Sequence, residues 1–314
     1  MARFSRRAGR QLLAKEQRAY LRRDREGWEG HLTKAQAFFG QGLQQADPDR
    51  PVLILGAGTG LEIPWQLAPR RTTGWDADPW SRLGTLLRHR RFPTWVFDDF
   101  TGGFQELRST LERVFVLPGS IQRRPPERAA RRLAGLLPSL QPNAEPLRAW
   151  ILAHEPDTIL VANVLGQLGC VAERMVEAAF QPGQPWVRDP ELPDPLAEAL
   201  DAWTVRAIQA VAEVLGKCEA SVWMLHDRAV VQGDAPAALG ALEDSWVKQL
   251  RSEVPLEIGD PLLGLDLRQI FAERPETGFE RWLWPVGPGQ LHLMEALVYP
   301  GCSAHSDPEG VQTV

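Results

Sequence analysis

The chain has few cysteines and lacks a long apolar run. Cys170, Cys218 and Cys302 lie far apart with no CxxC spacing, a pattern that supports neither a disulfide framework nor a zinc site. No stretch approaches the roughly 20 apolar residues that cross a bilayer, and no apolar signal segment follows the basic start. We therefore expect a cytoplasmic protein that has no structural metal and no membrane partner.

An excess of charge of one sign is also missing. Lys and Arg number 35 against 40 for Asp and Glu, which gives a net charge of −5. This balance argues against a protein whose whole surface is built to hold nucleic acid. The 314 residues suit one large α/β domain with additions or two small ones, and no internal repeat is visible.

The most informative stretch is a strand that runs straight into glycines, VLILGAGTG from Val52 to Gly60. Its four apolar residues show no polar alternation, as in a strand buried on both faces of a parallel sheet. Gly56, Gly58 and Gly60 then form a turn without Cβ atoms, so the main chain can approach a ligand and adopt positive φ. The pattern predicts a nucleotide-cofactor loop.

The spacing of the glycines indicates which cofactor binds. A dinucleotide site uses GxGxxG, whereas here Leu61 stands where that pattern has its third glycine. Asp76 follows a second predicted strand, Thr72 to Trp75, where a carboxylate can accept both hydroxyl hydrogens of a ribose.

The chain resembles the class I S-adenosylmethionine-dependent methyltransferases over residues 50–230. The resemblance is carried by VLILGAGTG, by the GWDADP segment from Gly74 to Pro79 and by a later strand that ends at Asn163. The resemblance implies S-adenosylmethionine as the cofactor. One departure is Ile54, which stands where many members of the family carry an acidic residue that contacts the cofactor. The residues that the resemblance assigns to cofactor binding are Gly56, Ala57, Gly58, Gly60, Asp76, Asp98, Asp99 and Asn163.

Within that set, Asp98 and Asp99 follow a third strand and are expected near the adenine amino group, with a turn cap as the alternative. Asn163 is expected to hold the methionine part of the cofactor or a substrate nitrogen. The chain lacks the Asn/Asp-Pro-Pro-Tyr signature of many enzymes that methylate amino groups of nucleic acid.

His226 and Asp227 are the candidate catalytic residues. They are predicted to follow a fifth strand, Ala220 to Leu225, at the sheet edge where ligands bind. A histidine that titrates near neutrality is a natural general base, and a neighbouring carboxylate can orient its ring. The alternative is that the pair only caps the strand or a helix.

The predicted fold is α/β, a doubly wound, mostly parallel sheet of the Rossmann-like methyltransferase type. An antiparallel pair of strands, Arg281–Trp284 and Leu291–Tyr299, closes it near the C-terminus. We expect a helical extension and lid at 1–49, a methyltransferase domain at 50–300 and a loose tail at 301–314. An insertion at 101–150 contains prolines and arginines and forms either short helices on the substrate side or an inert elaboration.

The first 25 residues are strongly basic, with only Glu16 and Asp24 as acids. They are interpreted as a solvated helix, as a weak site for RNA or another anionic partner, or as an organelle transit peptide. The functional hypothesis is a methyltransferase that acts on an unidentified small molecule, protein or RNA. The alternative is a protein that binds S-adenosylmethionine or S-adenosylhomocysteine without catalysis.

Overall fold

A computed structural model describes residues 25–58, 60–77, 79–89, 93–115, 126–180, 194–232, 257–287 and 290–301. The basic segment 1–24 and the tail from residue 302 onward, for which the sequence made separate predictions, lie outside this part of the chain. Within it, none of the helices combines the length and apolarity that a bilayer span requires.

The fold is built on one eight-stranded sheet with the order β3-β2-β1-β4-β5-β8-β7, and β6 pairs with β5 off this path. The strands β3, β2, β1, β4 and β5 run parallel to one another. In contrast, β8 lies antiparallel between β5 and β7. The strands are β1 Val52–Leu55, β2 Thr72–Trp75, β3 Thr94–Val96, β4 Thr158–Ala162, β5 Ser221–Gln232, β6 Glu257–Gly259, β7 Gly278–Gly287 and β8 Gln290–Tyr299. The predicted α/β class, doubly wound parallel sheet and closing antiparallel pair are confirmed.

The fifth strand is longer than predicted. It was expected to end at Leu225, but β5 continues to Gln232. The reason is its partner, because β8 pairs with β5 from Val222 opposite Tyr299 to Gln232 opposite Gln290. The hydrogen bonds of the outer half of β5 therefore depend on a segment far along the chain, which local sequence does not reveal.

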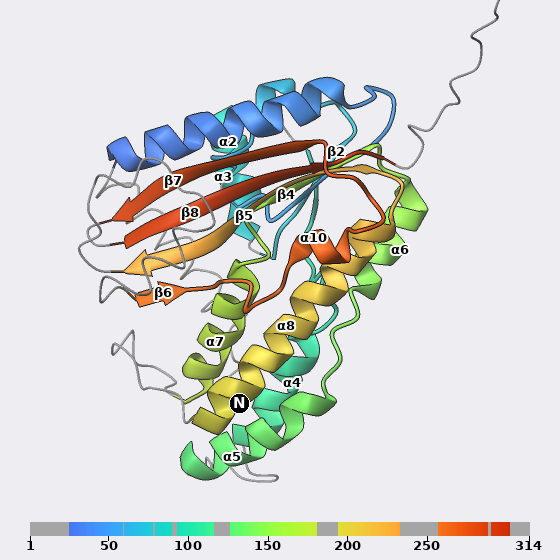
Figure 1. Cartoon of the computed structure of the whole chain (residues 1–314). Helices are drawn as coiled ribbons and strands as arrows, with labels where there is room; N and C mark the ends of the chain where they lie inside the picture. The colour runs from blue at the N-terminus through green and yellow to red at the C-terminus, as the bar shows by residue number, and fades with distance from the viewer. Residues whose placement is uncertain are drawn as a thin grey trace, which may run out of the picture.

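Helices cover both faces of the sheet (Figure 1). In β1, Val52 and Ile54 face the side covered by α2, and Leu53 and Leu55 face the side covered by α6 and α8. All four are fully buried, as expected for a strand inside a parallel sheet. The helices are α2 Arg25–Gln45, α3 Pro79–His89, α4 Phe104–Phe115, α5 Pro126–Leu136, α6 Glu145–His154, α7 Gln167–Phe180, α8 Asp194–Lys217 and α10 Leu267–Ile270, with short 3₁₀ turns η1 Trp65–Leu67 and η2 Leu137–Ser139.

The predicted lid at 1–49 is described from Arg25 onward, and this part is a layer of the fold. α2 lies along the sheet and buries one apolar stripe against it, including Trp28, Phe38, Phe39 and Leu43. Helical spacing of apolar residues produces such a stripe, so the helix prediction for this segment is confirmed.

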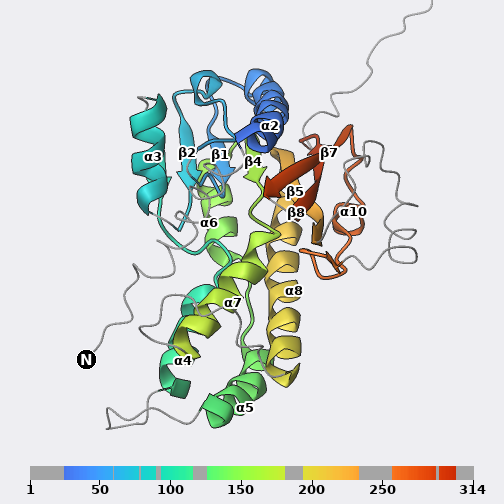
Figure 2. The same ribbon diagram turned by 90° about the vertical axis from the view of Figure 1, so that its left-hand side faces the viewer.

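A helical bundle stands beyond the carboxyl ends of the parallel strands (Figure 2). It consists of α4, α5, α7 and the amino-terminal half of α8, which share a core that contains Leu107, Leu133, Val176 and Trp203. The carboxyl-terminal half of α8 belongs to the sheet's own core, so this one helix joins the two cores. The predicted insertion at 101–150 supplies α4, α5 and α6, and the first two extend on the ligand-binding side of the sheet.

Arg274 joins the carboxyl end of α8 to the ends of two strands. Its buried guanidinium donates to the carbonyls of Leu215 at 2.9 Å and Cys218 at 3.1 Å. It also donates to Ala220 at 2.6 Å, to Tyr299 at 3.2 Å and to Pro300. The positive charge is stabilised by carbonyl dipoles, among them one at the negative end of a helix.

We predict that Arg274→Met lowers the free energy of unfolding by about 3 to 5 kcal/mol, because several buried carbonyls lose their donor at once. Urea denaturation measures the change. The control is Arg148→Met, since the Arg148 side chain is 53% exposed and pairs with Glu145 on its own helix. That variant should stay within about 0.5 kcal/mol of wild type. Equal stability of the two variants would show that the Arg274 contacts contribute nothing.

Candidate functional site

The glycine turn lies at the point where the strand order reverses. β1 is flanked by β2 on one side and by β4 on the other, and ligands of such sheets bind outside the carboxyl ends at this point. Gly56, Gly58 and Gly60 all have positive φ, at 68°, 52° and 71°. Residues with a side chain are strained in this conformation, so the three glycines permit the turn.

Packing distinguishes the three glycines. A Cβ atom on Gly56 would lie 2.4 Å from Val164 Cβ, and one on Gly60 would lie 2.5 Å from Trp65 Nε1. On Gly58 the nearest atom would be the Gly56 carbonyl oxygen at 3.7 Å, which is ordinary contact. Gly56 and Gly60 are therefore required by the protein's own packing, whereas the residues that the structure describes leave the space at Gly58 open.

Ala57 lies between the first two glycines. It is 4% exposed and belongs to the core beneath α2. A methyl group in the core contributes to packing, so this residue has only main-chain atoms to offer a ligand. Its assignment to the cofactor stays a prediction about main-chain contact.

Asp76 is bonded to the turn. Its Oδ2 accepts a hydrogen bond of 2.7 Å from the main-chain N–H of Gly58. The N–H of Asp76 donates in turn to the Val96 carbonyl at the end of β3. The structure thus brings together the glycine turn and the acid that sequence reasoning assigned to the same ligand. A carboxylate accepts up to about four hydrogen bonds, so holding Gly58 is compatible with holding ribose hydroxyls.

Asp99 fixes the start of α4. Its Oδ1 accepts from the N–H and the hydroxyl of Thr101, at 2.9 and 2.6 Å. Its Oδ2 accepts from the N–H groups of Phe104 at 2.6 Å and Gln105 at 3.4 Å. These are the contacts of a turn and helix cap, the alternative weighed from the sequence.

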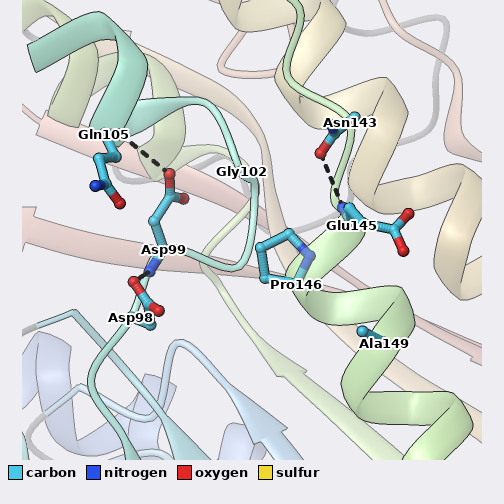
Figure 3. A pocket seen from close by; sticks show the side chains of 8 residues that line it. All are labelled: Asp98, Asp99, Gly102, Gln105, Asn143, Glu145, Pro146 and Ala149. Carbon is cyan, nitrogen blue, oxygen red and sulfur yellow. Dashed lines mark hydrogen bonds between the residues drawn. The ribbon is translucent and has the colours of Figure 1, made fainter. Parts of the chain in front are cut away.

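Asp98 lines a cavity of about 410 Å³ beside this turn (Figure 3). Its carbonyl accepts from Trp75 Nε1 at 2.8 Å, which connects it to the end of β2. Its Oδ1 accepts from the Asp99 N–H at 2.8 Å. The wall is completed by Asp99, Gly102, Gln105, Asn143, Glu145, Pro146 and Ala149. Both oxygens of Asp99 are engaged by the cap, so Asp98 is the carboxylate that suits a ligand presenting hydrogen-bond donors, such as an amino group.

Asn163 ties the end of β4 to β5. It is 2% exposed, and its φ of 48° turns the chain away from the strand. Its N–H donates to the Leu225 carbonyl at 2.9 Å, and its Oδ1 accepts from the Asp227 N–H at 3.1 Å. The amide oxygen thus ties the end of β4 to the middle of β5, and a contact with the methionine part of a cofactor stays a prediction.

His226 is inside β5, so the prediction that it follows the strand is wrong. The residue is 1% exposed. Its Nε2 lies 3.2 Å from Oε2 of Glu295, in a geometry that falls short of a hydrogen bond, and its Nδ1 is 3.2 Å from the Asp227 carbonyl. The Asp227 carboxylate does not contact the His226 ring, because successive side chains of a strand point to opposite faces.

Glu295 is the centre of a buried charged cluster that the sequence did not reveal. Its Oε1 accepts from Nη2 of Arg281 at 2.7 Å and lies 3.4 Å from Nη1 of Arg268. Burial by itself raises the pKa of Glu295, but contact with His226, the bond from Arg281 and the charge of Arg268 together lower it from 4.5 to about 2. His226 thus belongs to a structural cluster with Glu295 on β8, Arg281 on β7 and Arg268 on α10.

Asp227 contacts a histidine that sequence reasoning missed. Its Oδ1 lies 2.9 Å from Nδ1 of His292, near the start of β8. Nε2 of the same ring is 3.0 Å from Nε2 of Gln290. A polar residue within the apolar stretch of β8 was the available signal, but only the pairing of β5 with β8 shows which carboxylate it meets.

α2 is bonded to the segment that leaves the glycine turn. Trp282 Nε1 donates to Nδ1 of His31 at 3.1 Å, and Nε2 of His31 lies 2.9 Å from Glu62 Oε1. An indole N–H only donates, so Nδ1 of His31 is unprotonated and Nε2 carries the hydrogen toward Glu62. Gln36 adds a bond of 2.6 Å to the Leu61 carbonyl. These bonds fix the position of α2 relative to the segment that follows the glycine turn.

The part of the chain that the structure describes contains no group of three His, Cys, Asp or Glu side chains able to hold a metal ion. The site offers hydrogen-bond donors, carboxylates and imidazoles, which suit an organic ligand and proton transfer.

No protein-family model matches the chain, and no curated protein matches it. Among solved structures it is similar to the N-methyltransferase NodS from Bradyrhizobium japonicum WM9, with 11% identity and a TM-score of 0.34. The match covers 88% of this chain and 98% of that one. A likeness of this size says nothing about activity, which depends on the site itself.

The charged cluster predicts how stability depends on pH. Because Glu295 has a lowered pKa, its charge stabilises the fold fully above pH 4.5, and this contribution declines as the pH falls toward 2. Glu295→Gln should therefore cost about 3 kcal/mol at pH 7 and progressively less below pH 4.5, as measured by urea denaturation at each pH. Glu112→Gln, at a side chain 51% exposed, is the control and should show no such trend. A cost that is the same at pH 7 and pH 3 would contradict the assignment.

Proposed function

We propose that this protein is a methyltransferase that uses S-adenosylmethionine. The observation that carries the proposal is the bond between Gly58 and Asp76, which joins a left-handed glycine turn to the acid after β2 at the reversal of strand order. That combination suits an adenosyl ligand, whose ribose hydroxyls can be accepted by the carboxylate while the chain passes close over the turn.

The residues present fit this cofactor better than a dinucleotide. The glycines follow GxGxG, and Leu61 stands in place of the glycine that would lie beneath a pyrophosphate. Ile54, at the position of the family's usual acid, is fully buried in the core beneath α2 and contributes packing alone. Holding the ligand therefore falls to the turn and to Asp76.

The other residues take roles that follow from their position. Asp98, in the wall of the 410 Å³ cavity, is assigned to the adenine amino group, since a carboxylate accepts what that group donates. When bound, S-adenosylmethionine supplies a methyl group on a positively charged sulfur. The chain needs to hold a nucleophile in line with that group and to give its proton a destination.

The acceptor is assigned to the same edge of the sheet. The bundle of α4, α5, α7 and the start of α8 extends there and gives the site a wall that the sheet alone lacks (Figure 2). The acceptor is a small molecule, a protein side chain or RNA. A protein that only binds the cofactor is the competing function, and methyl transfer from labelled S-adenosylmethionine distinguishes the two.

Calorimetric titration tests the cofactor. We predict binding of S-adenosylmethionine and S-adenosylhomocysteine in preference to NAD. Asp76→Ala should weaken that binding by about 1 to 3 kcal/mol, because a charged acceptor is lost. Glu219→Ala, at an exposed residue before β5 on the opposite edge, should leave it unchanged. Binding of NAD with no response to either adenosyl ligand would overturn the proposal.

Gly58→Ala separates ligand binding from folding. The new methyl group has space but forces a side chain into positive φ, so we expect a loss of stability of about 1 to 2 kcal/mol with the fold retained. Affinity for S-adenosylhomocysteine should fall at least about tenfold, since the methyl group enters the space left for the ligand. Gly135→Ala is the matched control for both measurements, since Gly135 lies on α5 and a Cβ there would have none of the described residues within 4 Å. If Gly58→Ala binds as well as this control, the ligand lies elsewhere.

A further inference from the structure

We propose that His292, oriented by Asp227, is the group that takes the proton from the methyl acceptor. The inference rests on the proposed function and replaces the sequence-based choice of His226. It is carried by the hydrogen bonds of the His292 ring, by its exposure and by its connection to the carboxyl edge of the sheet.

The bonds to the ring define its tautomer. The nitrogen of the Gln290 side-chain amide only donates, so Nε2 of His292, 3.0 Å away, must accept. The ring hydrogen is then on Nδ1, which donates to Oδ1 of Asp227 at 2.9 Å. A neutral imidazole with Nδ1–H on a carboxylate and a lone pair on Nε2 is the arrangement in which histidine acts as a general base.

The main chain that carries the Asp227 carboxylate is itself held in place. The Asp227 N–H donates to Oδ1 of Asn163, which directly follows β4. A bulge lies between Asp227 and Ala229 in the pairing of β5 with β8, and bulges change the direction of side chains at such points. The main chain of Asp227 is therefore held against the residue that follows β4, at the point where its carboxylate meets His292.

The chain of contacts leads from this pair to the glycine turn. Asn163 is followed by Val164, whose side chain packs against Gly56 at the start of the turn. Gly166, two residues after Val164, lies beside Asp227, since a Cβ atom on Gly166 would be 3.7 Å from the Cβ of Asp227. His292, on β8, thus stands two strands beyond β4, with β5 between them, at the edge where the cofactor is proposed to bind.

Exposure distinguishes the two histidines. The His292 side chain is 13% exposed, whereas that of His226 is 1% exposed and is held against Glu295. Gln290 covers the lone pair of His292 with a single neutral hydrogen bond, which an acceptor N–H or O–H can replace. His226 offers no comparable position.

The proton balance is as follows. The acceptor is an amine or a hydroxyl compound whose nucleophilic atom still carries a proton when it binds. Its lone pair forms the bond to the methyl carbon as the carbon–sulfur bond breaks, and that electron pair stays on sulfur. The acceptor's proton passes to Nε2 of His292, which becomes an imidazolium balanced by Asp227 and later releases the proton to water.

The charged and titratable groups near the ring are few among the described residues. Asp227 faces the ring from β5. The neutral indole of Trp284 faces it from β7, with the two ring centroids 5.3 Å apart. Beyond Trp284, the stacked ring of His31 comes from α2 and leads to Glu62. Asp227 is the charge in direct contact.

The test is long-range proton–nitrogen NMR of the full chain labelled in histidine, with His292→Gln used to identify the signals of this ring. We expect Nε2 to show the shift of an unprotonated nitrogen and Nδ1 that of a protonated one. Asp227→Asn should reverse the two, because an amide can donate to Nδ1. Asp49→Asn, in a turn before β1, is the control and should change neither signal. A ring with its hydrogen on Nε2, or one indifferent to Asp227→Asn, overturns the proposal.

The second measurement adds S-adenosylhomocysteine to the same sample. Its binding should shift the His292 signals and leave those of the exposed His154 in place. Calorimetry on the same protein distinguishes the two proposals. If S-adenosylhomocysteine does not bind, the proposed cofactor is wrong. If it binds without shifting the His292 signals, only the role of His292 as the base is wrong. On any amine or hydroxyl compound that the wild-type chain methylates, His292→Gln should lower kcat by about two to four powers of ten with cofactor affinity retained. Unchanged kcat also refutes the base.

Discussion

The turn after β1 is the constraint on which the site depends. Three residues with positive φ within five positions bring the chain back over the edge of the sheet, and Val164 and Trp65 fill the places that side chains would need at Gly56 and Gly60. At Gly58, by contrast, the nearest atom among the described residues would lie 3.7 Å from a Cβ, so a side chain would not collide with them. The same short turn therefore packs closely against the protein and leaves a space for a ligand. Both depend on the absence of a Cβ atom, which lets other groups approach the main chain.

The elements around the turn hold it from three sides. Asp76 bonds it from β2, Val164 packs on it from the segment after β4, and α2 bonds the residues that follow it through His31 and Gln36. Each contact comes from a separate part of the chain. A turn held in this way keeps its conformation before a ligand arrives, which reduces the entropy lost on binding.

Two buried groups of ionisable side chains occupy opposite faces of the long pair β5 and β8. Glu295 lies against His226 and pairs with Arg281 and Arg268, so the charge of the buried carboxylate is compensated by guanidinium groups. Asp227 and His292 form a smaller pair that reaches solvent through the imidazole. Successive side chains of a strand point to opposite faces of the sheet. His226 and Asp227 therefore belong to different groups although they are adjacent in sequence.

Local pattern in the sequence determined the strand before the glycine turn, the turn itself, the acid after β2 and the doubly wound class, because buried strands and glycine turns are defined by residues a few positions apart. It also indicated α2, whose apolar residues recur at helical spacing. What only the tertiary structure decided was the length of β5 and the partner of Asp227. Those depend on which distant segment lies opposite, and the pairing of β5 with β8 joins residues more than sixty positions apart, such as Asp227 and His292. No local periodicity encodes such a contact, since it is the burial and hydrogen bonding of the whole sheet that select it.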